Sequence, residues 1–143
     1  MSGVEVQENA INPDTPAPPG LAVCVVDDEP AVRQALTLAL RHFGLTVWEA
    51  GGGEEAVRLY RRHRDAIAAV LLDVRMPGLD GPQTLALLRR EDPAVRVVFM
   101  TGNTGDYAAE ELLGLGAAAV LEKPFGSLPE LARLLRQVTG RAW

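Results

Sequence analysis

The sequence predicts a doubly wound α/β fold, in which five helices cover both faces of a five-stranded parallel sheet. Two observations predict it. First, short runs of continuous apolar residues recur along the chain, and a run without alternation is typical of a strand buried on both faces. Second, a segment with apolar residues at helical spacing follows each run after a short connection. Strict alternation with right-handed crossovers makes the sheet parallel.

Length and composition indicate one soluble domain. The 143 residues, 48% of them hydrophobic and 23% charged, are enough to bury a core without metal or disulfide staples. No apolar run is long enough to cross a bilayer, and the N-terminus lacks the pattern of a signal peptide. The only cysteine, Cys24, lies in an apolar run and is expected to be a buried, inert thiol. The missing signal peptide and the single cysteine both favour the cytoplasm. The net charge of −5 argues against nucleic acid as the main ligand, so we expect neither a nucleic-acid nor a membrane partner.

The domain is expected to span residues 21–143. Residues 1–20 carry four prolines among small and acidic residues. Such a composition buries too little apolar area to offset the entropy of ordering, so these residues are expected to form a disordered tail.

The first strand is expected at residues 21–26, an apolar run that ends in Asp27 and Asp28. Pro30, which suits the first turn of a helix, opens a helix whose apolar residues recur at i, i+3, i+4, i+7, i+8 and i+11. Gly44 is expected to cap its C-terminal end.

The second strand, at residues 46–50, is more amphipathic, and Gly51, Gly52 and Gly53 lead into the second helix. These glycines match neither of the two common phosphate-binding motifs, so a plain turn is favoured over a phosphate-cradling loop. The inner face of the helix is expected to contain Ala56, Val57 and Tyr60. A basic cluster at its end is interpreted as a solvated face rather than a phosphate or partner patch: Arg58, Arg61, Arg62, His63 and Arg64.

The third strand, at residues 68–72, stops at Asp73, which two following turn signals leave at the mouth of the strand. A short helix over residues 82–90 is expected to bury Leu85 and Leu88. The fourth strand, at residues 95–100, ends at Thr101.

A weakly apolar helix is expected over residues 106–113, and we predict it to be the least stably packed of the set. The fifth strand, at residues 117–122, leads into Lys123. The last helix opens with an S-x-x-E capping box at Ser127 and Glu130.

Five polar residues follow these strands: Asp27 and Asp28, Asp73, Thr101 and Lys123. Because the carboxyl ends of parallel strands share one edge of the sheet, we expect these residues to converge there. Three adjacent carboxylates repel one another, and Mg²⁺, which prefers oxygen ligands, would relieve that repulsion. An ammonium group and a hydroxyl beside them suit a phosphoryl group, so the constellation indicates phosphoryl transfer.

Each residue also has an ordinary structural explanation. Asp27 and Asp28 could cap the following helix, Thr101 could be a turn hydroxyl, and Lys123 could be a surface lysine. Such an explanation is weakest for Asp73, because a turn cap seldom needs a doubly buried strand behind it. Taken jointly, five such coincidences are much less probable than one functional site.

Four motifs in this order resemble the receiver domain of two-component response regulators, over about residues 21–140. They are VVDDEP at residues 25–30, LDVRMPGLDG at 72–81, MTG at 100–102 and EKPF at 122–125. The resemblance implies a flavodoxin-like sheet with strand order 2-1-3-4-5. It also implies a signalling domain similar to stand-alone chemotaxis regulators, with no enzymatic activity beyond self-phosphotransfer and hydrolysis of its own acyl phosphate.

The resemblance further implies a role for each motif residue. Asp73 would be the phosphoacceptor, taking a phosphoryl group from the phosphohistidine of a sensor kinase or a histidine phosphotransfer protein. Asp28, Asp73 and the backbone carbonyl of Arg75 would bind Mg²⁺, and Asp27 would hold a metal-bound water. Thr101 and Lys123 would contact the phosphoryl oxygens.

Three secondary features follow from the same resemblance. The peptide bond between Lys123 and Pro124 would be cis. The side chains of Arg75 and Asn103 would tune the lifetime of the acyl phosphate. Receivers usually carry Tyr or Phe three residues before the lysine, where this chain has Val120, so the phosphorylation signal would be transmitted by backbone and helix shifts alone or the output would be unusual.

The leading hypothesis is a receiver without an output domain that signals through protein contact. Its partner face would combine the helix at residues 106–113, the strand at 117–122 and the last helix, and the protein would be a monomer or a phosphorylation-dependent homodimer. One alternative is a constitutive interaction module that works without phosphate. Another is a phosphatase of the haloacid dehalogenase type, which is disfavoured because Arg75 occupies the position where that family needs a second aspartate.

Overall fold

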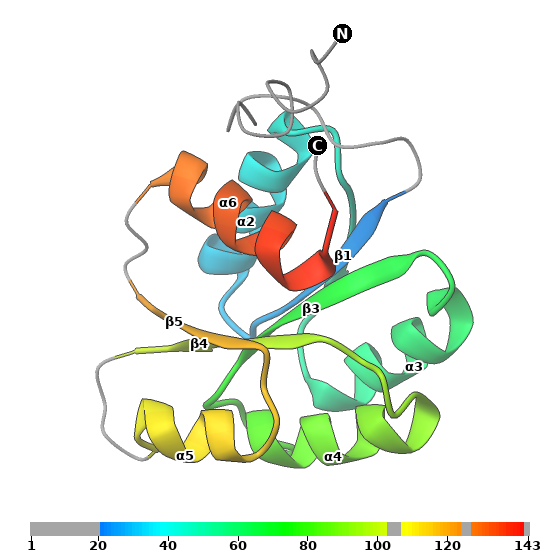
Figure 1. Ribbon diagram of the computed structural model, residues 1–143. Coiled ribbons are helices and arrows are strands. Elements are labelled where there is room, and N and C mark those ends of the chain that lie inside the picture. Colours follow the sequence, from blue (N-terminus) through cyan, green and yellow to red (C-terminus); the bar gives the residue numbers. More distant parts are fainter. Residues whose placement is uncertain (1–20, 103–106, 124–126, 142–143) are drawn as a thin grey trace, which may run out of the picture.

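The computed structural model of the protein describes residues 21–102, 107–123 and 127–141 (Figure 1). The predicted tail, Asn103 and Pro124 lie outside these residues. The described elements alternate without exception between strand and helix. In chain order they are β1 (Ala22–Val26), α2 (Pro30–His42), β2 (Thr46–Ala50), α3 (Gly53–His63), β3 (Ile67–Asp73), α4 (Gly81–Glu91), β4 (Val97–Thr101), α5 (Ala109–Gly114), β5 (Ala119–Glu122) and α6 (Leu128–Thr139).

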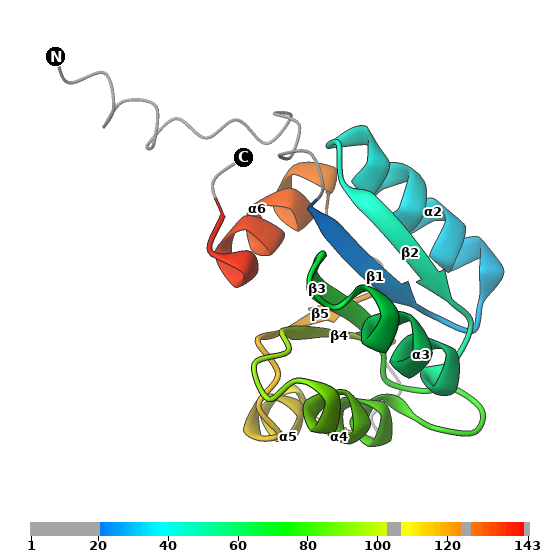
Figure 2. The ribbon, with the colours of Figure 1, turned by 90° about the vertical axis from the view of Figure 1, so that its right-hand side faces the viewer.

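All strand pairs are parallel, and the sheet has the order β2-β1-β3-β4-β5. The predicted fold class and strand order are thus confirmed. Helices α3, α4 and α5 cover one face of the sheet, and α2 and α6 cover the other (Figures 1 and 2). The molecule therefore has three layers, as expected for a doubly wound protein.

The continuous apolar runs are explained by this layering. Along β1, Cys24 and Val26 pack into the core beneath α3 and α4, whereas Val23 and Val25 pack into the core beneath α2 and α6. Because both faces of the strand are buried, no position calls for a polar residue. Cys24 is a free, fully buried cysteine, which confirms the expectation of an inaccessible thiol.

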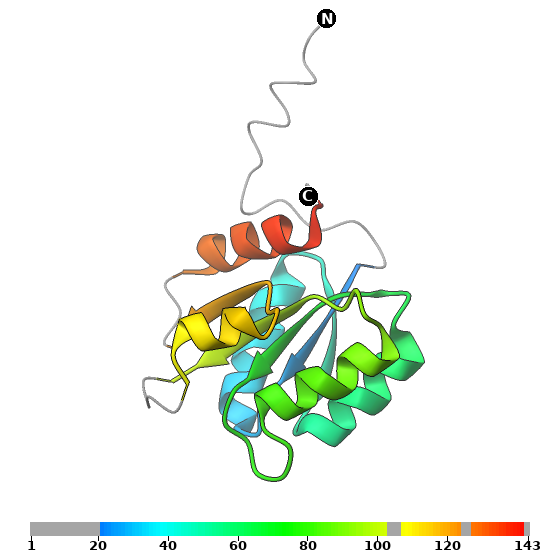
Figure 3. The same cartoon turned by 60° about the horizontal axis from the view of Figure 1, so that its bottom comes forward.

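Helices α3 and α4 lie side by side on their face of the sheet (Figure 3). At their contact, a Cβ atom on Gly53 would lie 2.2 Å from Oγ1 of Thr84 and 2.8 Å from Cβ of Leu79. This position therefore needs glycine for close packing. The third glycine of the 51–53 run serves helix contact, which agrees with a plain turn and not with a phosphate-binding loop.

Helix ends follow the predicted caps closely. Gly44 follows α2 with a positive φ of 86°, a conformation that favours glycine. The hydroxyl of Ser127 accepts a hydrogen bond of 3.2 Å from the backbone N–H of Glu130 at the start of α6. At α4, Asp80 and Gln83 form a reciprocal capping box, where the sequence had indicated only a turn.

Helix α5 is shorter than predicted and begins at Ala109 rather than at residue 106. The carboxylate of Glu111 accepts the backbone N–H of Ala108, which marks the start of the helix. Only Leu112 of this helix is buried, which agrees with light packing. None of the helices in the described part of the chain combines the length and apolar character that spanning a bilayer requires.

Candidate functional site

The polar residues predicted to converge lie at the carboxyl edge of four adjacent strands. Asp27 follows β1, Asp73 is the last residue of β3, Thr101 is the last residue of β4, and Lys123 follows β5. The backbone N–H of Lys123 donates to the carbonyl of Thr101 over 2.8 Å, so these two strand ends are joined directly.

Asp27 and Lys123 form the buried centre of the site. Asp27 is completely buried, and its carboxylate accepts hydrogen bonds from Lys123 Nζ at 2.8 Å and from the backbone N–H of Glu29 at 2.9 Å. The same ammonium group lies 3.4 Å from Oδ1 of Asp73. One cation is thus shared by two carboxylates. A buried carboxylate needs such a paired cation to stay ionised.

Asp27, Asp28 and Asp73 form an acidic triad. One carboxylate oxygen from each lies within 4.8 Å of the others. Asp73 is buried, whereas Asp28 is exposed to solvent, so the triad is open on one side. A donor set made only of oxygens, open to water, fits Mg²⁺, which retains several waters when it binds protein carboxylates.

The electrostatics of Asp73 show that the triad is short of positive charge. Burial and the neighbouring charge of Asp27 raise the pKa of Asp73 to about 6, although Lys123 opposes the shift. Burial acts to lower the pKa of Lys123, but its hydrogen bond to Asp27 and the charges of Asp73 and Asp27 raise it. Lys123 therefore stays protonated, and Asp73 is ionised at neutral pH at a free-energy cost that a bound cation would offset.

The backbone around Asp73 is held by Gly81. The N–H of Gly81 donates to the carbonyl of Val74 over 2.8 Å. A Cβ atom on Gly81 would lie 2.7 Å from the carbonyl oxygen of Asp73 and 2.9 Å from Cε1 of Phe99. Glycine at this position lets α4 begin directly against the end of β3.

Thr101 and Val120 occupy the neighbouring strands β4 and β5. The hydroxyl of Thr101 donates to the carbonyl of Gly102 over 2.8 Å. Its hydrogen is therefore used by the backbone of the next residue. Val120 is partly buried and packs against the core beneath α3, α4 and α5. Asn103 and Pro124 fall outside the described residues, so the roles expected of them stay predictions.

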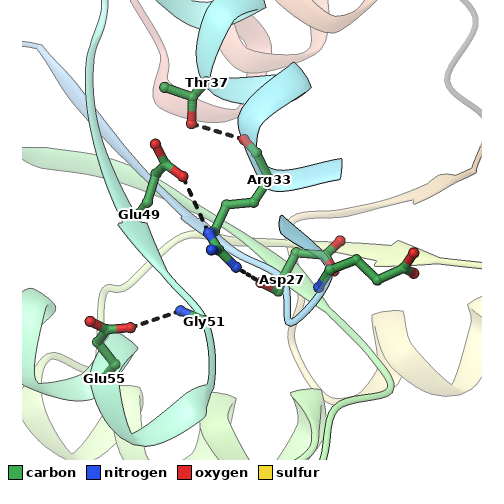
Figure 4. A network of polar contacts seen from close by, with 7 residues as sticks. Asp27, Arg33, Thr37, Glu49, Gly51 and Glu55 are labelled. Atoms are coloured by element: carbon green, nitrogen blue, oxygen red, sulfur yellow. Dashed lines mark hydrogen bonds and ion pairs between the residues drawn. The ribbon is translucent and has the colours of Figure 1, made fainter. Parts of the chain in front are cut away.

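Two residues of the site were missed in the sequence. The guanidinium group of Arg33, on α2, donates to the carbonyl of Asp27 (Figure 4). The hydroxyl of Tyr107 donates to Asp80 over 3.3 Å, and both residues line an open cleft of about 640 Å³ together with Val74 and Arg75, which follow Asp73 in the chain. An arginine one turn into the helix after two acids was the available signal for Arg33. Nothing local distinguishes Tyr107 from any other loop aromatic.

Three of the five residues in the basic cluster at the end of α3 make structural contacts, while Arg58 and Arg62 are exposed. Arg61 pairs with Glu91 at 2.6 Å, Arg64 donates to the carbonyl of Glu91, and the ring of His63 stacks on Trp48 with a centroid distance of 3.8 Å. These contacts join α3 to its neighbours, in agreement with the interpretation as a solvated face.

Fold and site together define a doubly wound protein that carries an acid triad and a lysine at the carboxyl edge of its parallel sheet. The family model of the response regulator receiver domain matches residues 23–136. The chain belongs to this family, which confirms the resemblance seen in its motifs. The family is a signalling module, which argues against the dehalogenase-type alternative.

Curated relatives and solved structures agree with this assignment. The chain is 35% identical to the probable transcriptional regulatory protein TcrX of Mycobacterium tuberculosis over 123 residues, which are 85% of this chain and 50% of TcrX. It is 33% identical to the sensor kinase CckA of Brucella abortus over 135 residues, 94% of this chain and 14% of CckA. The chain therefore spans half or less of the length of these two relatives.

Two solved receivers are similar in structure. The receiver domain of the Pseudomonas aeruginosa sensor histidine kinase PA1611, with a magnesium ion coordinated in its active-site cleft, has a TM-score of 0.75 and 31% identity, covering 85% of this chain and 98% of that one. The Borrelia burgdorferi CheX–CheY–BeF3–Mg complex contains a chain with a TM-score of 0.76 and 28% identity, covering 92% of this chain and 97% of that one.

Proposed function

We propose that the protein is a phosphorylation-dependent switch whose Asp73 accepts a phosphoryl group from the phosphohistidine of a sensor kinase or a histidine phosphotransfer protein. The observation that carries the proposal is the position of Lys123, whose ammonium group lies between Asp27 and Asp73 beside an open acid triad. A structural salt bridge would need one carboxylate, whereas this ammonium group contacts two, and the third, Asp28, lies beside them.

The phosphoryl transfer follows from the chemistry of the Asp73 carboxylate and the phosphohistidine of the donor. A carboxylate oxygen of Asp73 attacks the phosphorus atom and forms a P–O bond while the P–N bond of the donor breaks, and the imidazole nitrogen leaves with the electron pair. A pKa of about 6 means that Asp73 is ionised and nucleophilic at neutral pH. The triad is open to solvent on the side of Asp28, which leaves room for the donor to approach.

Charge neutralisation is the main catalytic requirement of such a transfer. Asp28, Asp73 and the backbone carbonyl of Arg75 would hold Mg²⁺, with Asp27 acting through a water. When bound, the ion supplies positive charge to the phosphoryl oxygens. Lys123 already lies next to Asp73 and would pair with a phosphoryl oxygen, and Thr101 would donate its hydroxyl after breaking its bond to Gly102.

The output is proposed to be a protein contact on the face formed by α5, β5 and α6. Helix α5 has six residues, of which one is buried, so its position costs little to change. The similar CheY of Borrelia burgdorferi was solved with CheX, BeF3 and Mg²⁺, which supports a protein partner as the type of output. For the present chain, the use of a protein partner and the absence of an output domain stay predictions.

Val120 favours a second candidate function, an interaction module that does not respond to phosphate. A side chain with no ring and no polar group would transmit less of any change at Thr101. This candidate predicts one fixed arrangement of α5 and β5, whatever the state of Asp73.

A fluoroberyllate titration in the presence of Mg²⁺ separates the two candidates, with backbone amide NMR as the readout. The switch predicts shifts at Asp73 and Lys123 and also along α5 and β5. Shifts limited to the strand ends would favour the constitutive module. No response at any position would contradict the phosphoacceptor proposal.

A further inference from the structure

Every polar backbone and side-chain group of Asp27 has a partner. Its N–H donates to the carbonyl of Ala50 at 3.1 Å, and its two carboxylate oxygens accept from Glu29 and Lys123. Its carbonyl oxygen accepts a 2.7 Å hydrogen bond from Nη1 of Arg33. Of these contacts, the one with Arg33 acts on the peptide group that leads to Asp28.

That peptide group links two residues of the acid triad. Because the peptide bond is planar, a fixed carbonyl of Asp27 also fixes the N–H of Asp28 and the direction in which the chain continues. Asp28 is exposed and lies in the loop before α2, so packing does not determine its orientation. The Arg33 side chain therefore fixes the peptide group on the N-terminal side of Asp28 and so contributes to the direction from which the Asp28 carboxylate reaches the triad.

Arg33 is itself held in the required orientation. Its Nε donates to Oε1 of Glu49 on β2 over 3.2 Å, while its backbone carbonyl accepts from the hydroxyl of Thr37 (Figure 4). The guanidinium group is a rigid fork, so fixing Nε aims Nη1 at the carbonyl of Asp27. The carboxylate of Glu49 also balances the charge of Arg33, which leaves the negative charge of the triad available to a cation.

We propose that Arg33 is a positioning residue of the metal site, which holds the peptide between Asp27 and Asp28 in the geometry that binds Mg²⁺. The inference rests on the proposed function, because it assumes that the triad binds the ion. A merely structural role, in which Arg33 only ties α2 to β2, would affect stability but not the affinity for the ion.

The test is a Mg²⁺ titration of the full chain, followed by the backbone amide NMR shifts of residues 27–29 and 73–75. In Arg33→Met, which keeps the aliphatic stem but has no donors, the dissociation constant for Mg²⁺ is expected to rise about tenfold. Arg33→Lys keeps the positive charge but not the fork that joins Glu49 to the carbonyl of Asp27, so its dissociation constant is expected to lie between those of the wild type and Arg33→Met. Phosphorylation by acetyl phosphate at saturating Mg²⁺ should change much less than the affinity.

Two further variants complete the design. Arg61→Met removes another arginine–glutamate ion pair, that with Glu91, from the last turn of α3 and should leave Mg²⁺ affinity unchanged. Glu49→Met removes the acceptor of Arg33 Nε, which frees the guanidinium fork without removing it, and should weaken Mg²⁺ binding by about threefold. It gives a second measurement if Arg33→Met does not fold.

The outcomes are separable. A wild-type protein that does not respond to Mg²⁺ contradicts the proposed function itself. A wild-type response together with unchanged affinity in Arg33→Met or, if that variant does not fold, in Glu49→Met overturns the role of Arg33 alone. A loss of affinity in Arg61→Met as large as that in Arg33→Met would also overturn it, because the effect would then not be specific to the residue beside the triad.

Discussion

The ammonium group of Lys123 donates a 2.8 Å hydrogen bond to the carboxylate of Asp27, which lies 96 positions earlier in the chain. The bond joins the ends of β1 and β5, which are separated in the sheet by β3 and β4. Asp27 is fully buried, and the side chain of Lys123 is 18% exposed. The charge that stabilises Asp27 is thus the charge that lies next to the proposed phosphoacceptor.

Lys123→Met should destabilise the fold as well as impair signalling. It leaves the buried carboxylate of Asp27 without its cation, and the free energy of unfolding is expected to fall by about 3 kcal/mol in urea denaturation. In the double variant with Asp27→Asn, the loss should be smaller than the sum of the two single losses. Additive losses would show that the two groups do not interact.

Asp73→Asn should stabilise the protein at neutral pH in the absence of Mg²⁺. The pKa of Asp73 is raised to about 6, which means that its charged form is less favourable in the folded than in the unfolded chain. Removing the charge is expected to raise the free energy of unfolding by on the order of 2 kcal/mol.

Mg²⁺ provides the control for that measurement. Added Mg²⁺ should stabilise the wild type by mass action and narrow the gap to Asp73→Asn, which lacks one ligand. A variant less stable than the wild type without metal would contradict the view that the triad is short of positive charge.

Gly81→Ala should disturb the site through the backbone. The added Cβ would approach the carbonyl of Asp73 to 2.7 Å, and overpacking of this kind costs about 2 kcal/mol. Gly114→Ala is the matched control, because it lies in a helix with nothing within 4 Å and should stabilise slightly. Thermal unfolding measures both, and equal effects would exclude close contact at Gly81.

The strands and the triad were predictable from the sequence because both depend on simple patterns. Apolar runs without alternation identified the strands, and the parallel order of the strands placed Asp73 and Lys123 at one edge of the sheet. Helix α5 was predicted too long because the periodic pattern did not show that Glu111 accepts the N–H of Ala108.

The contacts of long polar side chains could not be predicted from such patterns. The position of Arg33 one turn after two acids was visible, but the direction of its side chain was not, since its several rotatable bonds allow many directions and only the position of Glu49 selects one. Tyr107 was overlooked for a similar reason, because its partner Asp80 belongs to a different loop. Contacts between loops depend on tertiary packing and leave no periodic signal in the chain.

Incubation with acetyl phosphate and Mg²⁺, followed by intact-mass spectrometry, tests the central claim most directly. The wild type is expected to gain the mass of one phosphoryl group, and the gain should be lost in Asp73→Asn and when Mg²⁺ is chelated. Arg61→Met, altered far from the site, should be phosphorylated like the wild type. Persistence of the gain in Asp73→Asn, or its absence in the wild type, would contradict the assignment of Asp73 as the phosphoacceptor.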